Sequence, residues 1–323
     1  MKNMKTAAGM LCLAGILSLG MGTTVFAEDG DSHYPVTITT YNYENEPVEM
    51  TFEKAPEKVF AYANSNIEEL LALGLGDKIV AAYGLDGDVR EDLKDEFDKI
   101  QYMDTKPSKE EVVAMEPDFI AAWYSSFSDD WLSDVSFWQE RDVNTYMSLN
   151  SAAKGPASEF PRTIEDEYED ILNLGKIFDC EDKAEEIVDQ MKGEIDKVKE
   201  HVEGTDPLSV AVLEDEGDSF RVYGTETLGG NIPETLGAEL KLGAENSENV
   251  GAEDLIAADP DVLFMINYDG FMTADEAIAD ITDNPAYASL SAVKNNKVFS
   301  VNLNEVYCSG VRTYDGIMTF AKA

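Results

Sequence analysis

The chain has 323 residues, a length that allows two domains of ordinary size. Its composition, 44% hydrophobic and 28% charged, provides for a packed core and argues against global disorder. Its net charge of −41 at pH 7 repels polyanions, so nucleic acid and anionic lipid surfaces are poor partners, and most of this charge is expected on a solvated surface. With only two histidines, His33 and His201, we expect no trio of His and acid that could hold a bare zinc or manganese ion, and no resident metal.

The first 27 residues are typical of a cleaved export signal. Two lysines are followed by the apolar run Ala7–Leu19, and Val25–Ala27 ends it with small residues at its outer positions. We predict cleavage after Ala27, which takes the net charge from −41 to −43 and places the protein in the periplasm or on the outer face of the cell membrane. The run is too short to span a membrane comfortably, and we interpret Cys12 as part of it.

Residues 28–158 are predicted to form a first lobe. Thr37–Tyr41 and Val48–Phe52 are expected to pair as a short hairpin. Strands and helices then alternate, which indicates parallel βαβ units. The expected elements are a strand at Val59–Tyr62, a helix at Asn66–Leu73, a strand at Ile79–Ala82, a helix that begins with the capping box Ser108–Glu111, and a strand at Phe119–Trp123.

A linking helix is expected within residues 159–205. The loop-like stretch Ser151–Ser158 precedes it, and a helical apolar stripe runs from about Ile164 to Val202. Asp179–Asp182 is a candidate interruption. As one helix, this segment would reach about 50 Å or more at 1.5 Å per residue.

Residues 206–323 are predicted to form a second lobe of the same kind. The expected strands are Ser209–Leu213, Phe220–Tyr223, Val262–Ile266 and Val298–Val301, and the expected helices are Ile232–Leu240, one beginning at Gly251, and Asp315–Lys322.

One motif occurs in both lobes. EEVVAMEPDF at Glu110–Phe119 recurs as EDLIAADPDV at Glu253–Val262. Each copy reads as a helix followed by a buried strand. The predicted fold class is therefore α/β, with two Rossmann-like lobes, each with a mostly parallel central sheet, joined by one long helix.

Four stretches carry a resemblance to a known family: Pro56–Gly74, the two repeats, and Ser291–Val301 with Ser309–Arg312 after it. Through the order and spacing of these four stretches, the chain resembles the substrate-binding proteins of ABC importers for iron complexes and vitamin B12. These are the class III periplasmic binding proteins. The resemblance covers nearly the whole chain after the signal. It implies a monomeric protein, not an enzyme and without a cofactor, whose lobes close little over their ligand because a long helix hinges poorly.

The resemblance also implies a ligand and a partner. The ligand would be an organic complex that itself carries iron or cobalt, in the order ferric siderophore, corrinoid, haem. The partner would be an ABC permease, contacted through Glu110 and Glu253, one in each repeat. An acid in the first turn of a helix also stabilises the helix dipole by about 0.3–1 kcal/mol, so both roles are open. Glu111 and Asp254 are better explained by capping alone.

Ligands of open α/β sheets lie beyond the carboxyl ends of the strands. This rule selects side chains that follow the predicted strands of both lobes. By contrast, Trp131, Val135 and Trp138 have helical spacing and are expected in the core. The predicted ligand-binding residues are Tyr62, Asn64, Trp123, Tyr124, Phe127, Tyr268, Tyr307 and Arg312.

Three of these residues have a suggested role. The resemblance implies that Trp123 stacks on a large flat ligand. Arg312 would pair with a carboxylate or catecholate, or form a surface salt bridge instead. Tyr307 would ligate iron through its phenolate, or simply pack. Arg162 and Arg221 are weaker candidates for ligand contact.

Two other functions remain open at this stage. An exported α/β hydrolase is disfavoured because no Gly-x-Ser-x-Gly occurs and the two histidines are poorly placed for a triad. A sensory or adhesive ectodomain that reuses the binding fold would have the same sequence pattern. Cys180 and Cys308 are expected to be free, buried thiols.

Overall fold

The computed structural model describes residues 33–152, 161–243, 249–268 and 270–323. The predicted signal segment 1–27 and most of the predicted loop Ser151–Ser158 lie outside these residues. Within the described residues, no helix is both long and apolar enough to cross a membrane.

The first lobe opens with the predicted hairpin. Strands β1 (Val36–Tyr41) and β2 (Pro47–Phe52) pair antiparallel, with Val36 opposite Phe52. Ile38 and Met50 are buried, whereas their chain neighbours are exposed, which is the alternation of a sheet with one covered face. The predicted hairpin is therefore confirmed.

The first lobe is built on a parallel sheet of order β4-β3-β5-β6. These strands are β3 (Val59–Tyr62), β4 (Ile79–Tyr83), β5 (Phe119–Ala122) and β6 (Asn144–Met147). All four residues of β5 are buried, as expected of a strand in a sheet covered on both faces. The helices of this lobe are α1 (Asn64–Ala72), α2 (Lys94–Phe97), α3 (Lys109–Ala114), α4 (Val135–Gln139) and α5 (Leu149–Ala152).

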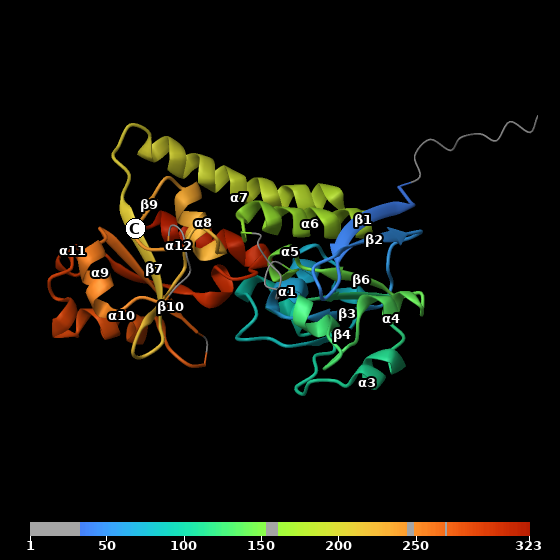
Figure 1. The fold of residues 1–323 in the computed structure, drawn as a ribbon. Coiled ribbons are helices and arrows are strands. Elements are labelled where there is room, and N and C mark those ends of the chain that lie inside the picture. Colours follow the sequence, from blue (N-terminus) through green and yellow to red (C-terminus); the bar gives the residue numbers. More distant parts are fainter. Residues whose placement is uncertain (1–32, 153–160, 244–248, 269) are drawn as a thin grey trace, which may run out of the picture. The chain divides into compact units, whose positions relative to one another are not determined.

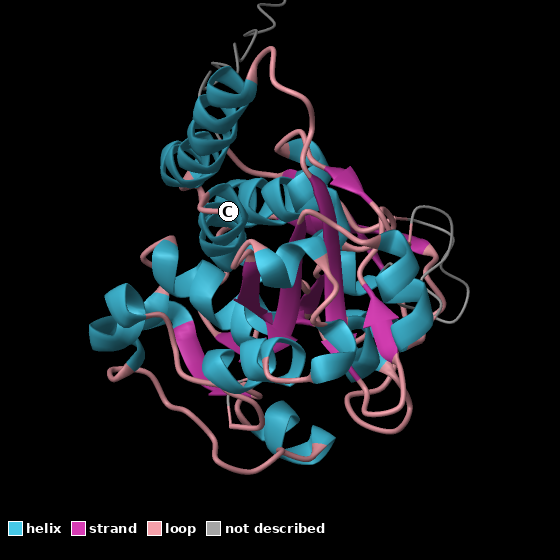
Figure 2. Cartoon of the chain, turned by 90° about the vertical axis from the view of Figure 1, so that its left-hand side faces the viewer, coloured by secondary structure: helices cyan, strands magenta, loops and turns pink. Residues whose placement is uncertain are grey.

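The second lobe has a mixed sheet of order β11-β10-β7-β8, with β9 also paired to β7. Its strands are β7 (Ser209–Asp215), β8 (Phe220–Val222), β9 (Glu239–Leu240), β10 (Val262–Asn267) and β11 (Val298–Asn302), and only β8 runs antiparallel to its neighbour. Figure 2 shows helices on both sides of these strands. They are α8 (Leu228–Thr235), α9 (Ala252–Ala258), α10 (Ala274–Thr282), α11 (Ser291–Lys294) and α12 (Thr313–Ala321).

The predicted helix Ile232–Leu240 is wrong in its bounds. Thr227 caps the helix by accepting a hydrogen bond from the Gly230 N–H, so α8 starts four residues earlier. Gly237 has φ +101°, which ends the helical geometry and allows Glu239–Leu240 to join β7 as a strand.

The predicted linking segment forms two helices rather than one, and the break lies at the candidate interruption Asp179–Asp182. The stripe divides into α6 (Ile164–Phe178) and α7 (Glu181–Val202), because Asp179 adopts a left-handed conformation at φ 55° and ends α6. The two helices fold back on each other so closely that a Cβ at Gly175 would lie 2.6 Å from the Cβ of Ala184. Only α7 runs across both lobes (Figure 1), and its 22 residues span about 33 Å rather than 50 Å.

The repeated motif has the same structural role in each lobe. The final Asp of each copy, Asp118 or Asp261, holds the chain where the lobe's first parallel strand starts. Asp118 accepts the backbone N–H groups of Glu57 and Lys58, and Asp261 accepts both the N–H and the hydroxyl of Ser209. The duplication therefore repeats a helix, a buried strand and the carboxylate that fixes the neighbouring strand.

Candidate ligand-binding site

Aromatic side chains from three parallel strands meet at the carboxyl edge of the first lobe's sheet. Tyr62 ends β3, Tyr83 ends β4, and Trp123 follows β5. The Tyr62 ring centroid lies 6.0 Å from that of Tyr83 and 6.3 Å from that of Trp123, and all three side chains are half-buried. Parallel strands end at a common edge, so the predicted residues Tyr62 and Trp123 come together here.

The second lobe supplies Tyr307 to the same place. Tyr307 follows β11, and its ring centroid lies 6.2 Å from that of Trp123. The Arg162 guanidinium lies 5.5 Å from the Tyr307 ring. Trp123 is therefore positioned between Tyr62 of one lobe and Tyr307 of the other. We call Tyr62, Trp123 and Tyr307 the aromatic site.

The electrostatic environment of the aromatic site differs between its two sides. Burial raises the pKa of Tyr62, and Asp86 and Tyr83 raise it further. Burial also raises the pKa of Tyr307, but Arg162 and Arg221 act in the opposite direction. The first-lobe side therefore faces a carboxylate, and the second-lobe side faces two guanidinium groups. Burial opposes the phenolate form that iron ligation by Tyr307 would need.

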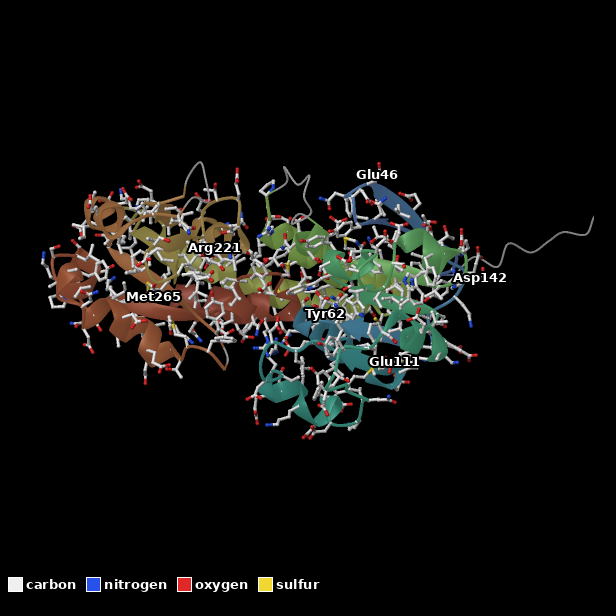
Figure 3. The ribbon with its side chains drawn as sticks, turned by 60° about the horizontal axis from the view of Figure 1, so that its bottom comes forward. Glu46, Tyr62, Glu111, Asp142, Arg221 and Met265 are labelled. Carbon is white, nitrogen blue, oxygen red and sulfur yellow. The ribbon has the colours of Figure 1, made fainter. Side chains whose placement is uncertain are left out.

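The two arginines were weak candidates from sequence, and the structure brings both near Tyr307. Arg221 lies on the edge strand β8 of the second lobe (Figure 3). Its side chain is 38% exposed and lies 3.5 Å from Glu214. Arg162 just precedes α6, and its backbone N–H donates to the Glu226 carbonyl. No spacing rule selects these positions, because one follows a loop and the other lies on a short strand.

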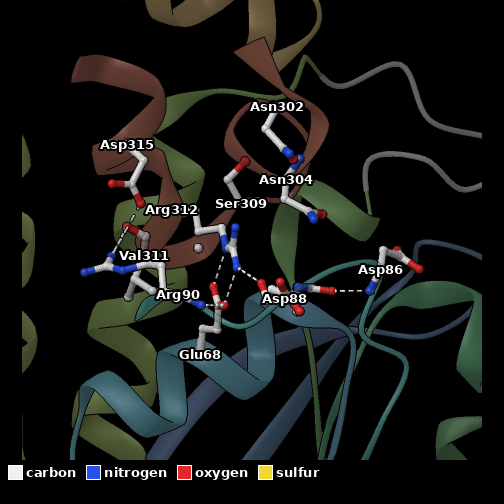
Figure 4. A network of polar contacts seen from close by, with 12 residues as sticks. Glu68, Asp86, Asp88, Arg90, Asn302, Asn304, Ser309, Val311, Arg312 and Asp315 are labelled. Atoms are coloured by element: carbon white, nitrogen blue, oxygen red, sulfur yellow. Dashed lines mark hydrogen bonds and ion pairs between the residues drawn. The ribbon is translucent and has the colours of Figure 1, made fainter. Parts of the chain in front are cut away.

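Arg312, predicted to face the ligand, instead joins the two lobes. Its Nε and Nη2 donate to the two carboxylate oxygens of Glu68 at 2.6 and 2.7 Å, and Nη2 also donates to the Asp88 carbonyl (Figure 4). The Glu68 side chain is 0% exposed and that of Arg312 is 11% exposed. The alternative of a salt bridge is thus correct for Arg312, although the bridge is buried rather than on the surface. This two-point pair occupies one edge of the guanidinium.

Arg90 extends this contact. Glu68 also accepts the Arg90 backbone N–H at 2.8 Å, and the Arg90 Nη1 donates to the Val311 carbonyl at 3.0 Å. Burial would lower the pKa of Arg90, but the hydrogen bonds that Arg90 donates to Asp92 and the charge of Asp315 outweigh it and raise the pKa. We call Glu68, Arg90 and Arg312 the polar contact.

Four other predicted residues take up different positions. Asn64 is 5% exposed and accepts the Asp86 N–H at 2.6 Å, so it fixes the loop after β4. Tyr124 follows Trp123 and stacks on Tyr43 at 5.8 Å. Tyr268 follows β10 and pairs with Met272. Phe127 is 1% exposed in the hydrophobic core, so its prediction as a ligand contact is wrong.

The other tryptophans support the site rather than form it. Trp131, Val135 and Trp138 are 8%, 1% and 1% exposed, which confirms the expected core packing. The Trp131 ring packs edge-on against Tyr62 at 4.7 Å. Gly84 also lies against this ring: it has φ +89°, and a Cβ there would clash with the Tyr62 Cε2. The Tyr62 ring is therefore packed closely by Trp131 and Gly84.

Two pockets lie away from the aromatic site. An apolar pocket of about 370 Å³ is lined by Val210 and Val262, at the amino ends of β7 and β10, the edge opposite to the one that binds ligands in such sheets. A polar pocket of about 500 Å³ is lined by Arg90 and Arg312, which the polar contact already engages.

One of the two histidines nevertheless meets two acids. His33 lies beside Asp179 and Glu181 at the turn between α6 and α7. Phe178 in this turn packs at 5.6 Å on Phe119, the first residue of β5, so the trio belongs to the end of the sheet opposite the aromatic site. Cys180 and Cys308 are free thiols, as predicted; Cys308 is buried and Cys180 is half-buried.

The predicted permease-docking acids are exposed in both repeats. Glu110 lies in the first turn of α3 and Glu253 in the first turn of α9. Capping is performed by their neighbours: Glu111 accepts the Ser108 N–H at 2.8 Å, and Asp254 accepts the Gly251 N–H at 2.9 Å. The predicted capping role of Glu111 and Asp254 is confirmed.

Two α/β lobes, a helix across them and aromatic side chains at the facing strand ends define the chain as a two-lobed binding protein. Residues 59–302 match the periplasmic binding protein family, and the chain belongs to that family. Its predicted recognition as a substrate-binding protein of ABC importers is confirmed, and the export predicted from residues 1–27 agrees with this membership.

Individual relatives cover most of the chain. The solved structure of a periplasmic binding protein from Veillonella parvula superposes on this chain with a TM-score of 0.81. The two sequences are 32% identical, and the alignment covers 88% of this chain and 89% of the Veillonella chain. The uncharacterized ABC transporter substrate-binding lipoprotein YvrC of Bacillus subtilis is 24% identical over 99% of this chain and 98% of its own length. The petrobactin-binding protein YclQ of the same organism is 24% identical over 80% of this chain and 78% of its own.

Proposed function

We propose that the protein captures an anionic organic iron complex at the aromatic site and delivers it to an ABC permease outside the cytoplasm. The observation that carries this proposal is the position of Trp123 between Tyr62 and Tyr307, with Arg162 beside Tyr307. Aromatic faces bury a flat ligand, and guanidinium groups pair with its carboxylate or catecholate oxygens.

The ligand class follows from the charges at the site. Arg162 and Arg221 both act on Tyr307, so a ligand with negative groups on that side is favoured. One relative is a petrobactin-binding protein, and another is an Fe(3+)-citrate-binding protein. We therefore rank a ferric siderophore or ferric citrate before a corrinoid, and a corrinoid before haem. The ligand would carry the metal, and the protein would contribute no cofactor.

Delivery is proposed to use the repeated acids. Glu110 and Glu253 occupy the same position in the two copies of the motif and are both exposed. Their neighbours already cap the helices, so the two acids are available for a partner. Matched carboxylates on two similar lobes suit a permease of two-fold symmetry that presents arginine or lysine side chains.

The test is a tryptophan-fluorescence titration of the protein with ferric citrate, a ferric catecholate siderophore, cobalamin and haemin. We expect saturable quenching in the micromolar range or better by one of the two ferric complexes. Trp123→Phe should remove most of the quenching, because Trp131 and Trp138 are core residues, and Trp138→Phe is the matched control. Saturation by none of the four compounds would contradict the proposal.

The delivery step is tested separately from capture. Glu110→Ala combined with Glu253→Ala should leave the ligand titration unchanged but lower uptake by cells that carry the cognate permease. Glu116→Ala with Asp280→Ala is a charge-matched control at other exposed acids of the two lobes. Normal uptake with the double variant of Glu110 and Glu253 would show that these acids do not contact the permease. The proposal that the protein captures the ligand would still stand.

A further inference from the structure

We propose that His33, Asp179 and Glu181 form a binding site for a divalent transition-metal ion of the zinc class, at the turn between α6 and α7. This site is separate from the aromatic site and does not depend on the proposed function.

The histidine ring is oriented as a metal ligand would be. Its Nε2 lies 2.7 Å from the Lys176 carbonyl oxygen, which has no proton to give, so Nε2 carries the hydrogen and donates it. The neutral ring then has its lone pair on Nδ1. A backbone carbonyl that fixes the free N–H in this way is the usual outer partner of a metal-bound histidine.

The lone pair faces two carboxylates. The Nδ1 atom lies 3.2 Å from Glu181 Oε1 and 3.4 Å from Asp179 Oδ1, and the three ligand atoms all lie within 4.8 Å of one another. Throughout the described part of the chain, His33 is the basic group found within 4.0 Å of these two carboxylates, and no Lys or Arg is. Three electron-rich atoms face one another, so a cation is needed between them: a proton on Nδ1 or a metal ion.

The distances also fit a metal ion. A proton shared between an imidazolium and a carboxylate gives N···O distances of about 2.7–2.9 Å. Zinc bonds of about 2.0–2.1 Å in tetrahedral geometry instead separate neighbouring ligand atoms by about 3.3 Å. The separations of 3.2 and 3.4 Å match the second arrangement.

The three ligands are held on a firm frame. Asp179 is fixed in its left-handed conformation at the end of α6, and Glu181 begins α7. Tyr34, next to His33, donates its hydroxyl to the Ile177 carbonyl at 2.8 Å, so two consecutive carbonyls of α6 hold this segment.

The site is also accessible. The side chains of His33, Glu181 and Asp179 are 22%, 37% and 59% exposed, so an ion can enter and water can complete its coordination. A bound ion would tie the segment around His33 to the α6–α7 hairpin.

The experiment is calorimetric titration of the chelator-treated protein, prepared without a polyhistidine tag, with zinc chloride in the presence of millimolar Mg²⁺. We expect one Zn²⁺ per chain. His33→Ala, Asp179→Asn and Glu181→Gln should each weaken binding at least tenfold, and Asn keeps the left-handed conformation of position 179 accessible. His201→Ala, which removes the exposed histidine near the end of α7, is the matched control and should bind as the unaltered protein does.

Thermal unfolding supplies a second measurement. Saturating zinc should raise the melting temperature of the protein and of His201→Ala, but not of His33→Ala, because an ion stabilises only the fold that binds it. The circular dichroism spectrum of His33→Ala should be unchanged without zinc. The proposal is overturned if no stoichiometric binding occurs, if His33→Ala binds undiminished, or if only Cys180→Ser abolishes binding.

Discussion

Two of the contacts between the lobes have opposite character. The aromatic site consists of half-buried rings with cations beside them, whereas the polar contact is a buried ion pair whose carboxylate accepts from two arginines. Both lie after strands of the two lobes, and the strand-end rule selected Arg312 alongside Trp123. The difference shows that an arginine at a strand end can pair with a buried carboxylate of the opposite lobe.

The largest expected effect comes from breaking the polar contact. Arg312→Gln leaves Glu68 buried without its main partner, and we expect a loss of about 3–5 kcal/mol in the free energy of unfolding. Glu68→Gln should cost a similar amount. The double variant Glu68→Leu/Arg312→Met should recover much of the loss, as measured by urea denaturation. A loss below about 1 kcal/mol in both single variants would show that the pair has little structural importance.

The next largest effect, about 2 kcal/mol in the free energy of unfolding, is expected when the pH changes. Glu167 on α6 accepts the Gly310 N–H of the second lobe, and burial raises its pKa from 4.5 to about 7. The folded protein therefore holds this proton more tightly than the unfolded chain. Its stabilising contribution is complete below about pH 4.5 and is lost as pH rises to about 7.

Glu167→Gln isolates that contribution because glutamine does not titrate. Its free energy of unfolding should fall less between pH 5 and pH 7 than that of the unaltered protein, by about 2 kcal/mol. Burial also raises the pKa values of Glu69 and Asp170, so part of the slope should remain. Identical slopes for the variant and the unaltered protein would exclude Glu167 as the titrating group.

The smallest expected effect sharpens the comparison at the aromatic site. Arg162→Ala and Arg221→Ala should each weaken binding of the ferric ligand about tenfold, or about 1.4 kcal/mol, with little change in stability. Arg312→Lys should show the reverse: lower stability in urea and nearly unchanged affinity in the fluorescence titration. Equal affinity losses for all three variants would mean that the two contacts do not divide these roles.

Sequence predicted the layers and the repeat well because both are local patterns. Strand Phe119–Ala122 is an unbroken apolar run, and the capping box at Ser108 is visible over four residues. The break between α6 and α7 was visible only as a candidate, since the apolar stripe continues across it. What ends α6 is the positive φ of Asp179, a backbone conformation that residue type alone does not fix.

The candidate site was predictable only where the strand-end rule applies. Tyr62, Trp123 and Tyr307 were found because they follow strands. The partner of Arg312 lies 244 residues away on the opposite lobe, and His33 meets the carbonyl of Lys176 across 143 residues. No periodicity connects such positions, so these pairings required the folded chain.

Gly84 has a consequence for how this binding protein could change its preference. It is not one of the predicted ligand-binding residues, yet its missing side chain leaves room for the Tyr62 ring. Even a methyl group at this position would push the phenol out of place and strain the backbone at φ +89°. A substitution at Gly84 would therefore change ligand selectivity by moving Tyr62, while every side chain of the aromatic site stays the same.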